Sequence, residues 1–173
     1  DALLATPMLE ILRAERPRAE IHAVVMFAAT RDMFSRDRSI DRVHYYDLIN
    51  GSKAGALRFL AGLRRERFDF SINIYPQNRR EYNLIAFAIG AKKRYAVRYL
   101  RRDAQNLSWV NSKTVTEDDR LHCVEENVRL LTLLGIERTL DEAALPSLRL
   151  TLDTEHEAMA EEWFIRHGID RSG

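Results

Sequence analysis

The chain has 173 residues, of which 46% are apolar and 31% are charged, with 27 lysines and arginines against 26 aspartates and glutamates. This length and balance are typical of one globular domain with its own core, and they exclude a disordered or fibrous chain. The sequence has no run of about 18 apolar residues, the pattern typical of a membrane-spanning helix. The single cysteine, Cys123, excludes an internal disulfide framework and favours a reducing, cytoplasmic environment. No cluster of histidine and cysteine has the spacing of a metal site.

The first predicted element is a helix over residues 2–16, where leucine, methionine and isoleucine recur at helical spacing. Pro7 has two interpretations here. It is either the first residue of a helix capped by Thr6, because proline suits the first turn, or it kinks a helix that already begins near Asp1.

Strands and further helices then alternate along the chain. In chain order, the predicted strands are residues 21–27, 42–46, 68–75, 94–97 and 148–152. The predicted helices are residues 30–36, 54–67, 82–89, 122–134 and 154–167. In the second of these helices, Leu57, Leu60 and Leu63 are expected to face inward. Gly90 and Gly135 follow two of the helices and are expected to end them in the left-handed conformation.

Strand–helix alternation predicts an α/β fold with a doubly wound, Rossmann-like parallel sheet. Ligands of such sheets bind outside the carboxyl ends of the strands. The loops that follow Phe27, Tyr46, Tyr75 and Val97 are therefore expected to line the site. Residues 98–120 form a polar, irregular segment that is long for a passive loop, so we expect it to be functional or mobile.

Charge is unevenly distributed. Residues 79–102 contain eight lysines and arginines and one acid, Glu81, whereas residues 117–173 contain fourteen acids and six lysines and arginines. The basic segment favours an anionic partner, and the alternative is an ordinary solvated surface. Because two of the loops expected to line the site feed this segment, the charge pattern and the expected ligand edge coincide.

The two ends of the sequence also carry an expectation. The chain begins directly with a helix, whereas a domain of this type normally begins with a strand, so we expect a preceding strand that is absent from this sequence. Residues 1–168 are predicted to form one domain, and residues 169–173 are predicted to begin a linker to a second domain.

Several segments share a resemblance, in the right order. Residues 1–13 read DALLATPMLEILR, residues 63–64 and 68–69 read LR and FD, residues 90–95 read GAKKRY, and residues 122–136 read HCVEENVRLLTLLGI. Together they resemble the lipopolysaccharide heptosyltransferase family, which opens with a strand, a Gly-Asp pair and a helix of the pattern D-x-L-L-x-T-P-x-L-x-x-L-R. The match begins at the aspartate and extends over nearly the whole chain.

The resemblance implies the N-terminal, acceptor-side half of a GT-B glycosyltransferase that lacks its first strand. Members transfer a heptose from ADP-heptose to the lipopolysaccharide inner core at the cytoplasmic face of the inner membrane, where they are peripheral. It therefore implies an inverting transferase that requires no cofactor or metal, with a nucleotide sugar as donor substrate. The donor is expected to bind the absent sugar-nucleotide-binding domain, the expected acceptor is lipopolysaccharide core or lipid A, and nucleic acid is not an expected partner. The fragment alone is expected to be inactive.

The resemblance assigns the catalytic base to Asp1. A carboxylate at a helix start stays ionised, because the helix dipole and free backbone N–H groups favour its charge. It becomes an effective base as the acceptor hydroxyl acidifies during attack on the sugar. From the residue pattern alone, the alternative is a helix cap without chemistry.

Four further residues are candidates for binding the acceptor: Arg79, Arg80, Arg98 and His122. Arginine binds carboxylates and phosphates through paired hydrogen bonds, and the lipopolysaccharide inner core carries both groups. The alternative for each arginine is a solvated surface position, and the alternative for His122 is a structural residue at a helix end.

Two other functions remain open at this level. One is a non-catalytic module that binds anionic glycan or a membrane surface through the basic segment. The other is a nucleotide-binding domain of an unrelated α/β enzyme, which the absence of G-x-G-x-x-G and G-x-x-x-x-G-K-[ST] motifs from the sequence disfavours.

Overall fold

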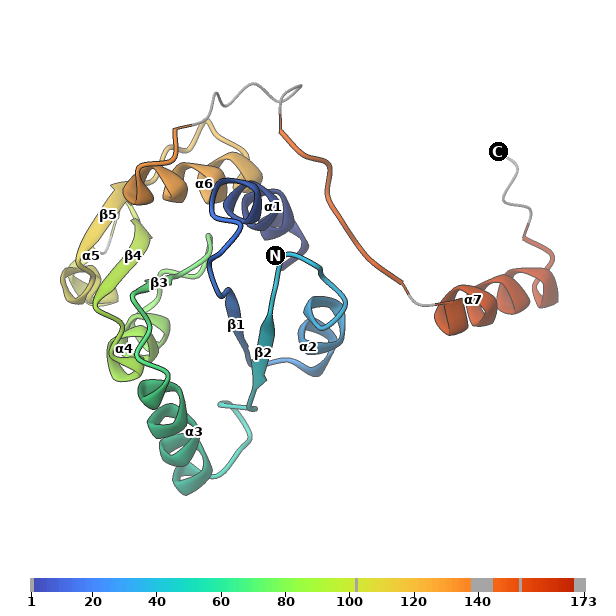
Figure 1. Ribbon diagram of the computed structural model, residues 1–173, viewed down its shortest axis with the longest axis horizontal. Coiled ribbons are helices and arrows are strands. Elements are labelled where there is room, and N and C mark those ends of the chain that lie inside the picture. The colour runs from blue at the N-terminus through green and yellow to red at the C-terminus, as the bar shows by residue number, and fades with distance from the viewer. Residues whose placement is uncertain (1, 102, 138–144, 153, 170–173) are drawn as a thin grey trace.

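The structure is a computed structural model, and it describes residues 2–101, 103–137, 145–152 and 154–169. All of its strand pairs are parallel (Figure 1). One sheet joins β1 (His22–Val25) to β2 (Arg42–Tyr45), and a second joins β3 (Phe70–Ile72), β4 (Lys93–Arg98) and β5 (Lys113–Thr116) in that order. The predicted parallel α/β fold is therefore confirmed.

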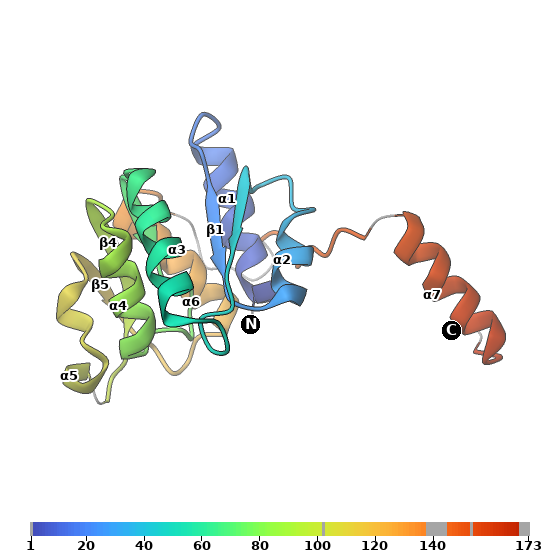
Figure 2. The same ribbon diagram turned by 90° about the horizontal axis from the view of Figure 1, so that it is seen from below.

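One helical layer is formed by segments from the two ends of the core. A short 3-10 turn, η1 (Ala2–Ala5), leads into α1 (Thr6–Glu15). Helix α6 (Cys123–Arg129), which continues as the 3-10 turn η3 (Leu130–Leu134), packs against both η1 and α1. Figures 1 and 2 show α1 and α6 together on the same side of the strands.

The opposite layer consists of α3 (Lys53–Arg65) and α4 (Arg80–Ile89), which pack side by side (Figures 1 and 2). Short elements complete the fold. Helix α2 (Ala28–Phe34) packs against β1 and β2, while α5 (Asp103–Asn106) and the 3-10 turn η2 (Ser108–Val110) pack against α4. Helices therefore cover both faces of the three-stranded sheet, as a doubly wound fold requires.

The core lies between the three-stranded sheet and the α1–α6 layer. Met8 and Ile11 of α1 meet Val97 of β4 there, together with Leu130 and Leu131, which are fully buried. Burial of one such side chain contributes about 1.5–3 kcal/mol. Because side chains alternate along a strand, Val97 points toward α1 and α6, and its neighbour at position 98 points toward the α4 side.

Over the described ranges, the two sheets are not joined by a strand pair, and β1 and β3 each have an unpaired edge. Among the described strands, β1 pairs with β2 and β3 pairs with β4, but no ladder joins β1 to β3. The rings of His22 and Phe68, which lie beside these two edges, are in edge-to-face contact with centroids 5.0 Å apart. Parallel strands are normally paired and covered. Between β1 and β3 the parallel pairing is interrupted among the described strands.

Four local features differ from the sequence prediction. Strand β5 was missed, because its sequence Lys-Thr-Val-Thr has a single apolar residue and it pairs only with β4 among the described strands. Residues 148–152 form no strand, although leucines alternate there. Leu57 is 69% exposed rather than inward, and Leu63 alone of the three leucines is fully buried. Thr6 is not a cap, because α1 follows a 3-10 turn and the Thr6 hydroxyl donates to the Leu3 carbonyl at 2.8 Å.

The last described helix, α7 (Thr154–Arg166), lies apart from both sheets at the end of an extended segment (Figures 1 and 2). Whether residues 1–168 act as one domain therefore stays a prediction. No helix among the described residues is long and apolar enough to cross a membrane.

Candidate active site at the carboxyl edge of the sheet

The starts of two helices and the ends of three strands meet at one edge of the fold. Since β3, β4 and β5 are parallel, the loops that follow them all leave the sheet at its carboxyl edge. Helix α4 begins after the loop that follows β3, and α6 begins after the loop that follows β5. The turn η1 packs against α6. The predicted base, Asp1, immediately precedes η1 and lies outside the described residues.

The three predicted arginines lie at this edge. Arg79 is the N-cap residue of α4 and Arg80 is its first residue, and both are exposed. The Arg80 guanidinium pairs with Glu81 at 2.8 Å. Arg98 ends β4 and donates to the Thr116 hydroxyl at 3.3 Å. Of these three, Arg79 makes no hydrogen bond or ion pair with another described side chain.

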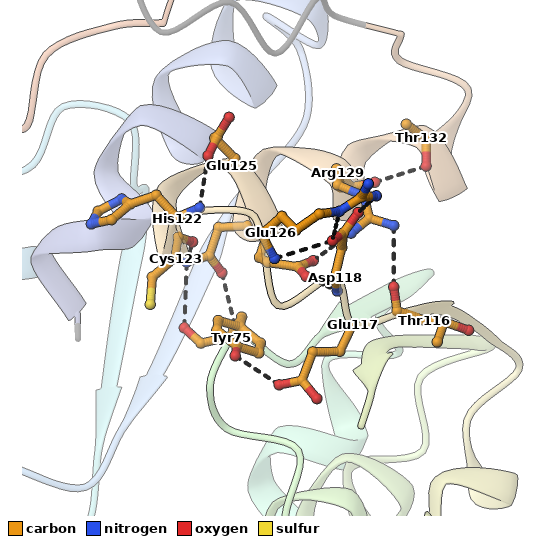
Figure 3. Close-up of polar contacts among 12 residues, drawn as sticks. Tyr75, Thr116, Glu117, Asp118, His122, Cys123, Glu125, Glu126, Arg129 and Thr132 are labelled. Atoms are coloured by element: carbon orange, nitrogen blue, oxygen red, sulfur yellow. Dashed lines mark hydrogen bonds and ion pairs between the residues drawn. The ribbon is translucent and has the colours of Figure 1, made fainter. Parts of the chain in front are cut away.

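His122 is the N-cap of α6, so its structural role is observed. Its Nδ1 accepts from the Val124 N–H at 3.3 Å, and the Glu125 carboxylate accepts from the His122 N–H at 2.7 Å. This reciprocal pair is a capping box. In the neutral ring, an accepting Nδ1 leaves the proton on Nε2, which can donate outward. Figure 3 shows the ring directed away from the rest of the cluster around α6.

The four predicted acceptor-binding residues all lie at the carboxyl edge of the sheet, but they do not all lie on the same face of it. Arg98 points toward the α4 side of the sheet, whereas His122 begins a helix on the α1–α6 side. No hydrogen bond or ion pair among the described residues joins any of the four to another. Their role in binding acceptor stays a prediction.

Sequence reasoning missed a tyrosine–glutamate pair at the centre of this edge (Figure 3). Tyr75, just beyond β3, donates its hydroxyl to Glu117, just beyond β5, at 2.8 Å. The other Glu117 oxygen accepts from the Leu100 N–H at 3.2 Å. Burial and the bond to Glu117 raise the pKa of Tyr75. The phenol therefore stays protonated and serves as a fixed donor, not as a base.

A buried carboxylate, that of Glu126, holds the loop between β5 and α6. Glu126 is 1% exposed and accepts from the Asp118 N–H at 2.5 Å and from the Arg129 guanidinium at 2.9 Å (Figure 3). Burial raises the pKa of Glu126. Arg120 holds the Asp118 carboxylate through a paired contact and lowers the pKa of Asp118. These bonds fix the turn that leads from β5 into α6.

A network of asparagines joins the loops after β3 and β4. Asn83 of α4 accepts from Asn73 at 2.9 Å and from Asn111 at 2.8 Å. It donates to the Asn78 side chain at 2.6 Å and to the Asn106 carbonyl at 2.8 Å. All four hydrogen-bonding positions of the Asn83 amide are therefore occupied.

Tyr99 fastens the same region. Its hydroxyl donates to the Pro76 carbonyl and accepts from the Asn78 N–H. Burial raises the pKa of Tyr99. These two bonds fix the loop after β3 against residue 99.

The arrangement places exposed cations on loops that buried hydrogen bonds hold in place, which suits binding of an anion. Within the described residues, no group of three or more His, Cys, Asp or Glu could hold a metal ion. The signal that would have located Tyr75 and Glu117 is their position in the loops at the carboxyl ends of two strands. For Glu117 that signal depended on recognising β5.

No protein-family model matches the chain, and no curated protein does. Solved structures do match. The glycosyl transferase family 9 protein from Veillonella parvula aligns with a TM-score of 0.70 at 21% identity, over 97% of this chain and 46% of its own. The ADP-heptose lipopolysaccharide heptosyltransferase II of E. coli aligns with a TM-score of 0.68 at 18% identity, over 94% of this chain and 46% of its own.

The chain has the fold of a family 9 glycosyltransferase half. A third structure, the E. coli heptosyltransferase WaaC with ADP, aligns with a TM-score of 0.66 at 16% identity, over 80% of this chain and 45% of its own. The chain thus spans about half the length of the family 9 structures that it matches. The fold class expected from the sequence, a Rossmann-like half of a GT-B glycosyltransferase, is confirmed.

Proposed function

We propose that this chain is the acceptor-binding half of an inverting glycosyltransferase that moves a heptose or related sugar from an ADP-sugar to the lipopolysaccharide inner core. The observation that carries the proposal is the alignment of nearly the whole chain with glycosyltransferases, two of them named as heptosyltransferases and one solved with ADP. The exposed arginines at the carboxyl edge support an anionic acceptor.

In the proposed reaction, the acceptor hydroxyl oxygen attacks the anomeric carbon of the donor sugar. The bond from that carbon to the ADP oxygen breaks, ADP leaves with the bonding electrons, and Asp1 takes the hydroxyl proton. Arg79, Arg80 and Arg98 bind acidic groups of the acceptor, and the Nε2 of His122 donates to it. The donor nucleotide binds a second domain. The whole protein acts in the cytoplasm, peripheral to the inner membrane.

The base is tested in a protein that joins this chain to a sugar-nucleotide domain, with transfer from ADP-heptose to an inner-core acceptor as the assay. Asp1→Asn is expected to lower kcat by roughly 10²- to 10⁴-fold, because an amide cannot take the proton. Asp32→Asn, on α2, is the control and is expected to keep normal turnover. Unchanged turnover of the Asp1 variant would reject Asp1 as the base.

The acceptor site is tested with this chain alone, by calorimetric titration with the inner-core acceptor. Arg79→Ala and Arg98→Ala are each expected to weaken binding roughly 10- to 100-fold, the value of a hydrogen bond to a charged group. Arg18→Ala, an exposed position before β1, is the control. If the arginine variants weaken binding and the joined protein transfers no sugar, the chain is a non-catalytic anion-binding module.

A further inference from the structure

The outer surface of α3 and α4 carries large apolar side chains that are open to solvent. Leu84 and Phe87 lie one helical turn apart on α4 and are 48% and 55% exposed, and Leu57 on the adjoining α3 is 69% exposed. The buried face of α4 is a different one, formed by Asn83, Ala86 and Ile89. The surface of this layer is therefore apolar where a surface helix is normally polar.

Of these two helices, α3 is strongly basic. Helix α3 contains Lys53, Arg58, Arg64 and Arg65 and no acidic residue. In the part of the chain that the structure describes, Lys53, Arg58 and Arg65 have no hydrogen bond or ion pair through their side chains. These cations are therefore available to an external anion.

The surface continues from α4 onto η2. The Arg94 guanidinium lies over the Phe87 ring, 5.5 Å from its centroid, and donates to the Val110 carbonyl at 2.9 Å. Trp109, the middle residue of η2, is 76% exposed. We call this surface the α3–α4 face and define it by six residues: Leu57, Arg58, Arg65, Leu84, Phe87 and Trp109.

We infer that the α3–α4 face binds the surface of an anionic lipid bilayer. Exposed leucine, phenylalanine and tryptophan enter the boundary between headgroups and acyl chains, and unpaired arginines meet anionic headgroups. Nucleic acid would use the cations but would leave Leu57, Leu84 and Phe87 without an apolar environment. The combination of unpaired cations with exposed aliphatic side chains therefore favours a bilayer.

This surface is separate from the acceptor site, so the inference does not require glycosyl transfer. It does bear on that site. Helices α3 and α4 begin at the carboxyl edge, so docking through them holds the loops at that edge close to the bilayer. An acceptor anchored in the bilayer would then reach Arg79 without leaving the membrane.

The test measures flotation of this chain with vesicles of phosphatidylcholine containing about one third phosphatidylglycerol, and with phosphatidylcholine alone. We expect binding to the anionic vesicles, weaker at high salt. Arg58→Glu with Arg65→Glu is expected to lower the partition coefficient at least about tenfold. The matched control, Arg18→Glu with Arg38→Glu, makes the same charge change at exposed positions elsewhere and is expected to stay within about twofold.

The apolar contribution has a closely matched pair of variants, because Phe27 and Phe87 are 56% and 55% exposed. Phe87→Ser is expected to weaken binding about tenfold and Phe27→Ser to leave it unchanged. The chain has two tryptophans. In a Trp163→Phe background, fluorescence therefore reports Trp109 alone and is expected to shift to shorter wavelength on the anionic vesicles. Circular dichroism verifies that each variant is folded.

Three results would overturn the inference: equal binding to neutral vesicles, equal loss in face and control variants, or no spectral shift of Trp109. Binding to single-stranded DNA that competes with the vesicles and is insensitive to Phe87→Ser would assign the face to nucleic acid instead. The vesicles contain neither acceptor nor ADP-sugar. Failure here therefore leaves the proposed transfer untouched, and failure of transfer leaves this result standing.

Discussion

Asn83 is expected to be the single polar residue on which the carboxyl edge most depends. Its side chain is 0% exposed and makes four hydrogen bonds, to Asn73, Asn78, Asn106 and Asn111. Each buried hydrogen bond contributes roughly 0.5–1.5 kcal/mol, and a partner left unsatisfied costs more. Asn83→Ala is therefore expected to lower the free energy of unfolding by about 4 kcal/mol.

A loss of that size corresponds to a fall in Tm of about 10 °C for a chain of this length. Asn83→Leu is expected to be at least as severe, because its bulk excludes the water that could replace the amide. Asn83→Asp places a carboxylate oxygen against the Asn78 side-chain oxygen and the Asn106 carbonyl, both of which now accept from Asn83, and is expected to destabilise as well.

The assay is urea unfolding followed by circular dichroism, with hydrogen exchange to locate the effect. Faster exchange is expected in residues 73–79 and 106–111, the two loops that Asn83 joins. Asn50→Ala, an exposed asparagine bonded to Asp47, is the control and is expected to change stability by less than about 0.5 kcal/mol. If Asn83→Ala cost under about 1 kcal/mol with an unchanged m-value, the network would not be holding these loops.

Three further predictions follow from the remaining contacts. Burial, and then the nearby charge of His22, lower the pKa of His44 below 6.5. The unfolded chain therefore takes up a proton at this residue more readily than the folded chain, and Tm is expected to fall as the pH is lowered from about 7.5 to 5.5. His44→Gln is expected to make that fall smaller. Glu126→Gln removes the charge that faces Arg129 and is expected to cost about 2 kcal/mol in urea unfolding, and no change would show that the pair contributes nothing. A strand of about five β-branched residues, fused through a short glycine loop ahead of Asp1, is expected to pair with the free edges of β1 and β3 and to raise Tm. Proline cannot donate a backbone hydrogen bond, so a proline-containing version is the control. An equal rise in Tm with that version would show that the added strand does not pair between β1 and β3.

The sequence was informative wherever a short-range pattern determines structure. Four of the five described strands, β1 to β4, overlap segments that the sequence predicted as strands. Gly90 and Gly135 were predicted to end helices, and both adopt φ of +73°, where a Cβ atom would be strained. The resemblance of ordered motifs indicated the fold that the solved structures share.

Contacts between segments that are distant in the sequence could not be predicted from such short-range patterns. The bond from Tyr75 to Glu117 joins residues 42 positions apart, and it exists because β3 and β5 flank β4. Strand β5 itself carries too few apolar residues to be recognised, because it lies at the edge of its sheet. From the sequence, His122 could be either an acceptor-binding residue or a structural residue at a helix end. Its hydrogen bonds with Val124 and Glu125 show that it caps α6.

The sequence by itself determined the alternation of strands and helices, the parallel sheet, and the helix ends at Gly90 and Gly135, because these depend on side-chain periodicity and on the conformational freedom of single residues. Only the tertiary structure decided which face of each helix meets solvent. Leu57 has the spacing of a buried residue, yet it is exposed on a layer whose cations lie beside it. Burial depends on which element packs against a helix, and the sequence of the helix alone does not specify that element.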